Sequence, residues 1–223
     1  MCSLLLVAPL LVLNTLSANF EREIVNQDLS EITSGIVYYQ EKERLTLEVT
    51  TPIHQMMIFN EDGTIIYYPE EKRAIQTKEK NSIRTLPFFQ MFIGAMKEDY
   101  GLAEAGYILK RHKKKEDILY TYWEPPKKMK KFLGTVILEM KKDRFVYMET
   151  RTPDNKPAIK VFFKDHIRFG DKYLPCQISI ERYGNSSLIK EYITYSDVRF
   201  NSPIPERILN FRIPDSVDIK EFK

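Results

Sequence analysis

The clearest pattern along the chain is a set of short segments in which apolar and polar residues alternate. Between residues 44 and 50 the alternation places Leu45, Leu47 and Val49 on one face and charged or hydroxyl side chains on the other. Successive side chains of a strand point to opposite faces of a sheet. The pattern therefore predicts a strand with one buried and one solvated face.

A tight hairpin is expected next. The runs 55–59 and 64–68 flank Asp62-Gly63, and this dipeptide supplies the positive φ that a short turn needs. Further strands are expected at 34–39, 118–123, 135–140, 145–150, 158–163, 177–183 and 188–197. Their close spacing predicts an antiparallel meander in a largely β protein.

One segment, residues 86–97, is too apolar for a single strand face. Pro87 suits the first turn of a helix, and Phe88, Met91, Phe92 and Met96 recur near the helical spacing. We expect a short helix lying on the sheet. Its simplest role is to cap the core.

The N-terminus carries an apolar run, Leu4 to Leu13, followed by the small residues Ser17 and Ala18. The run is too short to cross a bilayer, and this arrangement is typical of a secretory signal. We expect residues 1–18 to be a signal peptide cleaved after Ala18, and residues 19–223 to form a single domain. The alternative is a retained, buried N-terminal helix.

Composition supports one packed domain. The 223 residues are 43% hydrophobic and 12% aromatic, which excludes a mostly disordered chain, and 34 Lys and Arg against 31 Asp and Glu leave a net charge of +3. The basic runs Lys110–Lys115 and Lys127–Lys131 are expected to be turns between strands. They could assist encounter with anionic membranes or an acidic partner, or be solvated loops. The sequence contains no recognisable nucleic-acid-binding module, and we expect no nucleic-acid partner.

Catalytic and metal-binding patterns are missing from the sequence. His54, His112 and His166 lie far apart without metal-ligand spacing, and there is no nucleophile elbow or phosphate-binding loop. We therefore expect no catalytic residue, no metal and no cofactor, and a protein that is not an enzyme. Cys2 would leave with the signal, so Cys176 would have no partner for an internal disulfide.

Four stretches, taken in order, resemble the LolA family of periplasmic lipoprotein carriers. They are Ser34-Gly35-Ile36-Val37-Tyr38-Tyr39 followed by Arg44-Leu45-Thr46-Leu47-Glu48-Val49; Gln55–Phe59 with Asp62-Gly63 and Tyr67-Tyr68-Pro69; Tyr173-Leu174-Pro175 before the Gly184-Asn185 turn; and Phe200-Asn201, Pro203-Ile204-Pro205 and Phe211–Ile219. The resemblance covers nearly all of residues 19–223. No single motif is specific, and the order of all four carries the resemblance.

The resemblance implies a mainly β (α+β) fold, a curved antiparallel incomplete β-barrel closed by a helical lid, as in LolA and LolB. It implies that residues 88–96 form part of that lid, and we name as lid residues Phe88, Phe89, Met91, Phe92 and Met96. We expect an acyl-chain cavity whose wall includes Leu45, Leu47, Val49, Met57 and Phe59, since strand alternation gives them an inward face. Flexible thioether side chains suit such a loose apolar cavity, and further methionines are expected in or beside it: Met56, Met140 and Met148.

By resemblance, the function is that of a non-enzymatic periplasmic carrier. It would bind the acyl chains of lipoproteins, take them from an inner-membrane lipoprotein-releasing transporter and pass them to an outer-membrane acceptor. We expect a monomer. The alternative is a periplasmic lipid-binding or envelope-stress sensing domain that carries no lipoprotein.

Two features depart from the family pattern. The strand arginine that contacts the lid in family carriers corresponds to Thr46 here, which leaves open whether this lid is latched. The family's N-terminal helix is also hard to place between Asn19 and Ser34. The first strand would then follow a short start, or the apolar N-terminus would itself be that helix.

Overall fold

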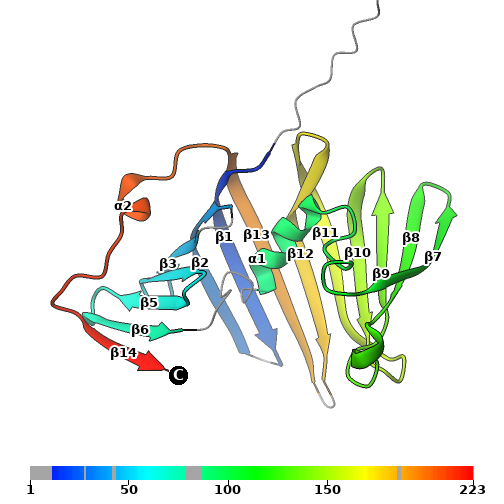
Figure 1. Cartoon of the computed structure of the whole chain (residues 1–223), viewed down its shortest axis with the longest axis horizontal. Helices are drawn as coiled ribbons and strands as arrows, with labels where there is room; N and C mark the ends of the chain where they lie inside the picture. Colours follow the sequence, from blue (N-terminus) through cyan, green and yellow to red (C-terminus); the bar gives the residue numbers. More distant parts are fainter. Residues whose placement is uncertain (1–11, 28, 42–43, 79–86, 185–186, 223) are drawn as a thin grey trace, which may run out of the picture.

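The fold is one open antiparallel sheet that curves around a helix (Figure 1). The computed structural model describes residues 12–27, 29–41, 44–78, 87–184 and 187–222. Its fourteen strands follow the order β14-β6-β5-β4-β3-β2-β1-β13-β12-β11-β10-β9-β8-β7. Neighbours pair antiparallel except β14 and β6, which pair in parallel. The incomplete barrel expected from the sequence is therefore confirmed.

The long strands form the middle of the sheet and the short ones its ends. The strands are β1 (Thr15–Asn26), β2 (Leu29–Gln40), β3 (Arg44–Thr51), β4 (Gln55–Asn60), β5 (Thr64–Tyr68), β6 (Arg73–Thr77), β7 (Ile108–Lys115), β8 (Ile118–Glu124), β9 (Val136–Lys141), β10 (Arg144–Arg151), β11 (Pro157–Phe169), β12 (Lys172–Tyr183), β13 (Leu188–Phe200) and β14 (Asp218–Phe222). The helical elements are α1 (Pro87–Ile93), η2 (Gly94–Met96), η3 (Lys127–Met129) and α2 (Glu206–Leu209).

Every strand expected from alternation is present, and so is the helix on the sheet. Four strands were not expected: β1, β6, β7 and β14. The expectation of a turn at Lys110–Lys115 is wrong, because these residues lie in the edge strand β7. All eight residues of β7 are exposed, so the strand has no apolar face that could have marked it. Lys127–Lys131 does lie in a connection, between β8 and β9.

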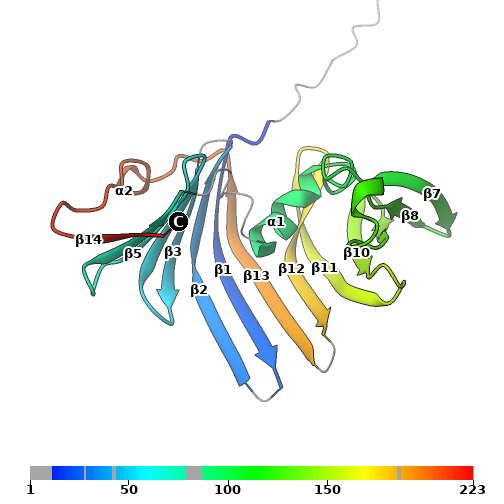
Figure 2. The same ribbon diagram turned by 60° about the horizontal axis from the view of Figure 1, so that its bottom comes forward.

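The core lies on the concave face, in the hollow that α1 occupies (Figure 2). Alternation along β3 puts Leu45, Leu47 and Val49 into this core, with exposed fractions of 0%, 2% and 1%. Phe88 and Phe92 of α1 belong to the same apolar cluster. The concave side of the sheet and the helix therefore form one continuous core.

The convex face has a smaller apolar cluster under the C-terminal segment. Ile204 and Ile208 pack there against Tyr38, Met56 and Ile58 of β2 and β4. The chain then continues into β14, which pairs with β6 at the edge of the sheet. The segment 202–217 thus covers the outer side of the sheet opposite α1.

The cleavage site expected after Ala18 falls inside β1. Leu16 and Ala18 are each 1% exposed, and residues 15–18 pair with residues 37–40 of β2. The expected apolar leader falls mostly on residues 1–11, outside the described residues. A cut after Ala18 would remove the first third of this central strand. A signal peptide that can be removed without damage to the fold would therefore have to end before Thr15.

The N-terminal helix of the family has no counterpart in residues 15–26, which form a strand. Within the described ranges, no helix has the length and apolar character needed to cross a membrane.

Candidate functional site

The site is built around α1, whose aromatic side chains rest on the concave face. Phe88, Phe89 and Phe92 expose 6%, 0% and 0% of their surface. The Phe92 ring stacks on Tyr195 of β13 at a centroid distance of 4.2 Å. Phe88 and Phe89 lie 5.5 Å from the rings of Phe20 and Tyr39. The helix is therefore held mainly by contacts between aromatic rings.

Two polar contacts with the sheet are made at Phe88 of α1. The Tyr195 hydroxyl donates to the backbone carbonyl of Phe88 over 3.2 Å, inside the core. The guanidinium of Arg22 on β1 lies 5.5 Å from the centre of the Phe88 ring, close enough for a cation–π contact. Both groups contact Phe88, near the start of the helix.

Arg22 is itself positioned by a buried carboxylate. Its Nε donates to Oε1 of Glu191 at 2.6 Å, and Arg182 donates to the other carboxylate oxygen at 3.1 Å. Glu191 is 2% exposed, and two arginines compensate its charge. This cluster, which joins β1, β12 and β13, orients the cation that faces the helix.

Thr46, which corresponds to the strand arginine of the family carriers, points away from the concave face. It alternates with Leu45 and Leu47, is 1% exposed, and accepts a hydrogen bond from Nε of Arg44 at 3.2 Å. Arg44 also donates to the carbonyl of Leu209 in the segment that covers the convex side. Thr46 therefore lies away from α1, and the cation beside the helix comes from Arg22, a residue that the sequence did not single out.

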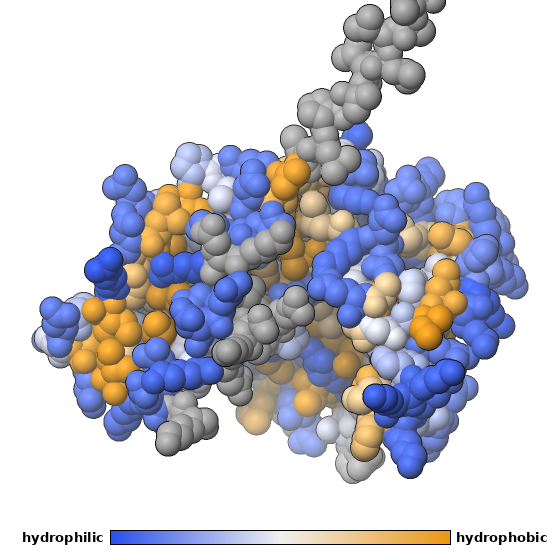
Figure 3. Space-filling model, viewed as in Figure 1, coloured by the Kyte–Doolittle hydropathy of each residue, from blue (hydrophilic) through white to orange (hydrophobic). Residues whose placement is uncertain are grey.

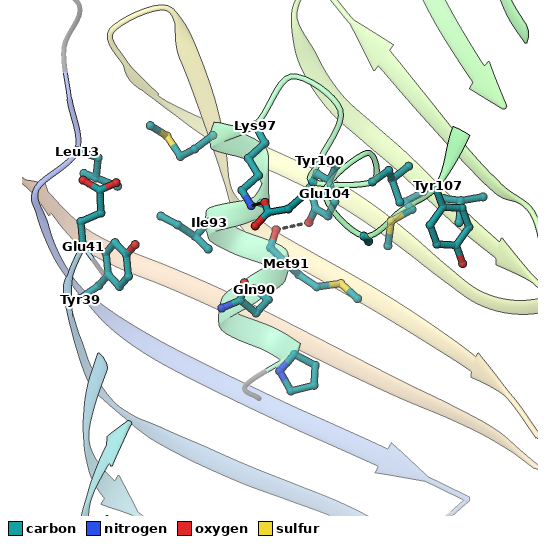
Figure 4. A pocket seen from close by; sticks show the side chains of 18 of the residues that line it. Leu13, Tyr39, Glu41, Gln90, Met91, Ile93, Lys97, Tyr100, Glu104 and Tyr107 are labelled. Atoms are coloured by element: carbon teal, nitrogen blue, oxygen red, sulfur yellow. Dashed lines mark hydrogen bonds and ion pairs between the residues drawn. The ribbon is translucent and has the colours of Figure 1, made fainter. Parts of the chain in front are cut away.

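A cavity of about 930 Å³ opens around α1 (Figure 4). Met91, Ile93 and Met96 line it from the helical segment, and Met148 and Val136 line it from the sheet. Leu13 and Tyr39 close it on the side of β1 and β2, and Leu102 and Tyr107 on the side of β7. Its lining is mostly apolar, with methionines on two sides.

Charged side chains stand at the rim of this cavity. Lys97 forms an ion pair with Glu104, and both line the cavity together with Glu41 and Glu61. The side chains of Lys97 and Glu104 are 52% and 54% exposed. The cavity thus joins an apolar interior to a charged, solvated opening.

Tyr100 fixes the segment that follows the helix. Its hydroxyl donates to the carbonyl of Met91, and its ring lies 5.1 Å from Phe145 and 5.4 Å from Phe163. A Cβ at Gly94 would come within 3.2 Å of this ring, so the position favours glycine. Burial raises the pKa of Tyr100 well above its ordinary value, as it does for Tyr195.

The five wall residues expected from the sequence lie on the concave face but away from the open cavity. Leu45, Leu47, Val49 and Phe59 are buried in the core with the phenylalanines of α1, and Met57 packs at its edge. Of the expected lid residues, Met91 and Met96 line the cavity, while Phe88, Phe89 and Phe92 are buried against rings of β1, β2 and β13 in the same apolar cluster. The helix therefore lies in the hollow of the sheet over β1, β13 and β12, and the expected wall residues belong to the same core.

Of the other expected methionines, Met148 lines the cavity and Met140 packs beside the core, whereas Met56 faces the convex cluster. Among the described residues there is no group of three or more His, Cys, Asp or Glu side chains that could hold a metal ion.

The same fold occurs in several solved structures of bacterial proteins. A LolA superfamily protein from Nitrosomonas europaea is 13% identical over 87% of this chain and 89% of its own, with a TM-score of 0.55. A DUF1329 family protein from Desulfovibrio piger is 12% identical over 88% and 89%, with a TM-score of 0.61. A protein described as a putative outer membrane lipoprotein-sorting protein domain, from Vibrio parahaemolyticus, is 12% identical over 88% and 89%, with a TM-score of 0.58.

No protein-family model matches the sequence, and no curated protein matches it either. The structural likenesses show that the chain has a LolA-like fold over nearly its whole length, as the sequence motifs predicted. At this level of identity the likeness concerns the fold alone.

Proposed function

We propose that this protein is a non-enzymatic carrier of lipid acyl chains, working in the periplasm on lipoproteins that pass from the inner to the outer membrane. The observation that supports the proposal best is the apolar cavity beside a helix that is held mainly by ring contacts. The LolA-like fold supports the same function, as does the printed description of the Vibrio parahaemolyticus protein.

Acyl chains would enter the cavity and then take the place of the helix on the concave face. Movement of α1 would uncover the rings that its phenylalanines contact, Phe20, Tyr39 and Tyr195, and would open the apolar core to which Leu45, Leu47, Val49 and Phe59 also belong. In this mechanism the phenylalanines hold the place of the lipid while the protein is empty.

The energies of this exchange allow reversible binding. Burying a chain of about sixteen carbons gains roughly 12 kcal/mol at about 0.8 kcal/mol per CH₂. Exposing three phenylalanines costs about 5–9 kcal/mol in the limit of full exposure. The displaced helix offsets a large part of the gain, so the protein could hand its cargo to an acceptor.

The direct test is mass spectrometry of what purifies with the protein from cell envelopes. Bound lipoprotein supports the proposal. Bound phospholipid without lipoprotein favours the alternative, a periplasmic lipid-binding or envelope-stress sensing domain. Absence of any lipid, together with no uptake of a fluorescent fatty-acid probe by the purified protein, contradicts both.

A pair of variants tests the location of the site. Ile93→Gln places an amide in the cavity and should weaken binding of the fatty-acid probe, because the amide loses water without a guaranteed partner. Leu209→Gln makes the same kind of change on α2, where the side chain is 41% exposed, and should bind the probe normally. Equal affinities for the two variants would place the probe elsewhere.

A further inference from the structure

The end of the sheet at β7 and β8 exposes a group of apolar side chains. Ile108 and Leu109 begin β7, and Met129, Phe132 and Leu133 lie in the connection that contains η3. Their exposed fractions are 60%, 45%, 41%, 74% and 37% in the same order. We call this group the apolar tip; Figure 3 shows apolar patches among hydrophilic residues on the side where β7 and β8 lie.

The two parts of the tip are joined. Glu124, at the end of β8, pairs across the strands with Ile108 and forms ion pairs with Lys110 at 3.5 Å and Lys130 at 3.1 Å. The backbone amides of Phe132 and Leu133 both donate to the carbonyl of Met129, which folds the connection into a compact loop. The five apolar side chains thus belong to the same end of the β7–β8 hairpin, with the consecutive residues Ile108 and Leu109 on opposite faces of β7.

Lysines surround these side chains. The tip segments, 108–110 and 124–133, contain five lysines, Lys110, Lys127, Lys128, Lys130 and Lys131, and a single acidic residue, Glu124. All five lysines are exposed. The end of the sheet therefore combines an apolar centre with a surplus of positive charge.

The apolar tip also lies next to the cavity in the chain. Ala105 and Tyr107 line the cavity, and Ile108 follows directly in the chain. A Cβ at Gly106 would meet the ring of Pro126 at 3.0 Å, so the segment beside the cavity packs against the start of the η3 connection. A molecule held at the tip would lie next to the rim of the cavity.

We propose that the apolar tip docks on the surface of a membrane containing anionic lipid. Lysines would approach the lipid phosphates while Phe132 and its aliphatic neighbours enter the interface, the combination by which peripheral proteins bind anionic membranes. A second copy of the chain would bring two basic tips together, which their charge opposes. Single-stranded nucleic acid needs a platform of aromatic rings, and within the tip segments 108–110 and 124–133 Phe132 is the only aromatic residue.

The inference can be tested without cargo, on the purified protein and vesicles, so it stands or falls separately from the carrier function. Binding is measured by flotation with vesicles of phosphatidylcholine and phosphatidylglycerol, and with phosphatidylcholine alone, at about 0.15 M salt. The protein should bind the mixed vesicles and show little binding to phosphatidylcholine alone.

Two variants separate the contributions. Phe132→Ser should weaken binding to the mixed vesicles about tenfold or more, because its ring no longer enters the interface. Lys127→Gln/Lys128→Gln should weaken it roughly 25-fold, about fivefold for each charge. Matched controls away from the tip are Leu29→Ser, where the side chain is 77% exposed, and Lys190→Gln/Lys220→Gln; both should bind like the unaltered protein.

Insertion can be checked by depth. In Phe132→Trp, brominated lipid should quench the added tryptophan, while Trp123, 8% exposed in the unaltered protein, should be little affected. Unchanged binding by Phe132→Ser, or an equal loss in the Leu29→Ser control, overturns the proposal. Binding that depends on the lysines alone, without quenching, also overturns it and leaves only electrostatic attraction, which an acidic protein could equally supply.

Discussion

A short helix packs on each face of the sheet, α1 on the concave face and α2 on the convex face, and the two helices are held in different ways. On the concave side, α1 rests on Phe20, Tyr39 and Tyr195 through ring contacts, with one hydrogen bond from the Tyr195 hydroxyl. On the convex side, α2 packs through the buried Ile208 and also carries a bidentate ion pair, in which Arg207 donates to both oxygens of Glu48 at 2.6 and 2.8 Å.

The chain segments that follow the two helices differ as well. The chain after α2 runs into β14, whose five residues pair with β6. The chain after α1 runs through the irregular segment 97–107, which lines the cavity. Apolar contacts are non-directional, whereas charged hydrogen bonds and strand pairing fix one geometry. In the proposed carrier mechanism α1 is the helix that an apolar ligand would displace, and α2 is the helix that would stay in place.

The largest effect should come from removing a ring of α1. Phe92→Ala empties a fully buried site and should lower the free energy of unfolding by about 3–5 kcal/mol, measured by urea denaturation. The same change should speed uptake of the fatty-acid probe, because the helix loses its stacking partner Tyr195. A stability loss without faster uptake would mean that α1 is a fixed cap.

Arg22→Met should come next. It removes one of two cations on the buried Glu191, and because Arg182 remains we expect about 2 kcal/mol, less than the roughly 3–5 kcal/mol for breaking a fully buried pair. It also removes the cation over Phe88, so hydrogen exchange of the α1 amides should quicken.

Arg182→Met is the matched control, since its guanidinium contacts Glu191 at 3.1 Å, whereas the cation–π contact with Phe88 of α1 is made by Arg22. It should destabilise the protein to a similar extent and leave exchange in α1 unchanged. Equal rates of hydrogen exchange in α1 for the two variants would show that Arg22 does not stabilise the helix.

Tyr195→Phe should have a smaller effect, about 1 kcal/mol, by removing the hydrogen bond to the Phe88 carbonyl while keeping the stacked ring. The variant should raise the rate of probe uptake about fivefold, by the same free energy.

The alkaline limb of the stability curve gives an independent check on this residue. Burial raises the pKa of Tyr195 and Tyr100, so the folded state favours their neutral forms. The stability this provides is complete below the ordinary value of 10.0 and is lost as pH rises from there through the raised pKa. Tyr195→Phe should make the decline above pH 10 shallower, and an unaltered decline would rule out titration of Tyr195.

The smallest change in stability is expected at α2. Arg207→Met breaks the ion pair with Glu48, but the arginine side chain is 57% exposed, so the loss should be about 0–1 kcal/mol. Exchange in β14 should quicken while probe uptake stays normal. Faster probe uptake in this variant would contradict the expectation that only α1 controls entry to the cavity.

Local alternation was enough to predict most of the fold. Leu45, Leu47 and Val49 were placed on the inner face because a half-buried strand repeats every two residues. Strand β7 was missed because an edge strand of exposed lysines has no such repeat. Strand β1 was missed because its first residues, including Leu16 and Ala18, resemble the end of a signal sequence.

The site was predicted less completely than the fold. The resemblance pointed to Met91 and Met96, which do line the cavity, but it could not show that Phe89 and Phe92 would be fully buried beside Tyr39 and Tyr195. Arg22 and Glu191 are 169 residues apart in sequence and meet only through the pairing of β1 with β13. No local pattern marks such a contact.

That pairing has a consequence for how the chain folds. Strands β2 to β6 and β7 to β13 form two meanders in which each strand pairs with its neighbour in the chain, so each can form by closing short loops. Strand β1 joins them by pairing with β13, across a loop from Asn26 to Ile189. Closing so long a loop is slow compared with hairpin formation, and it requires a nearly complete chain. The middle of the sheet, where α1 later comes to rest, should therefore form after both meanders.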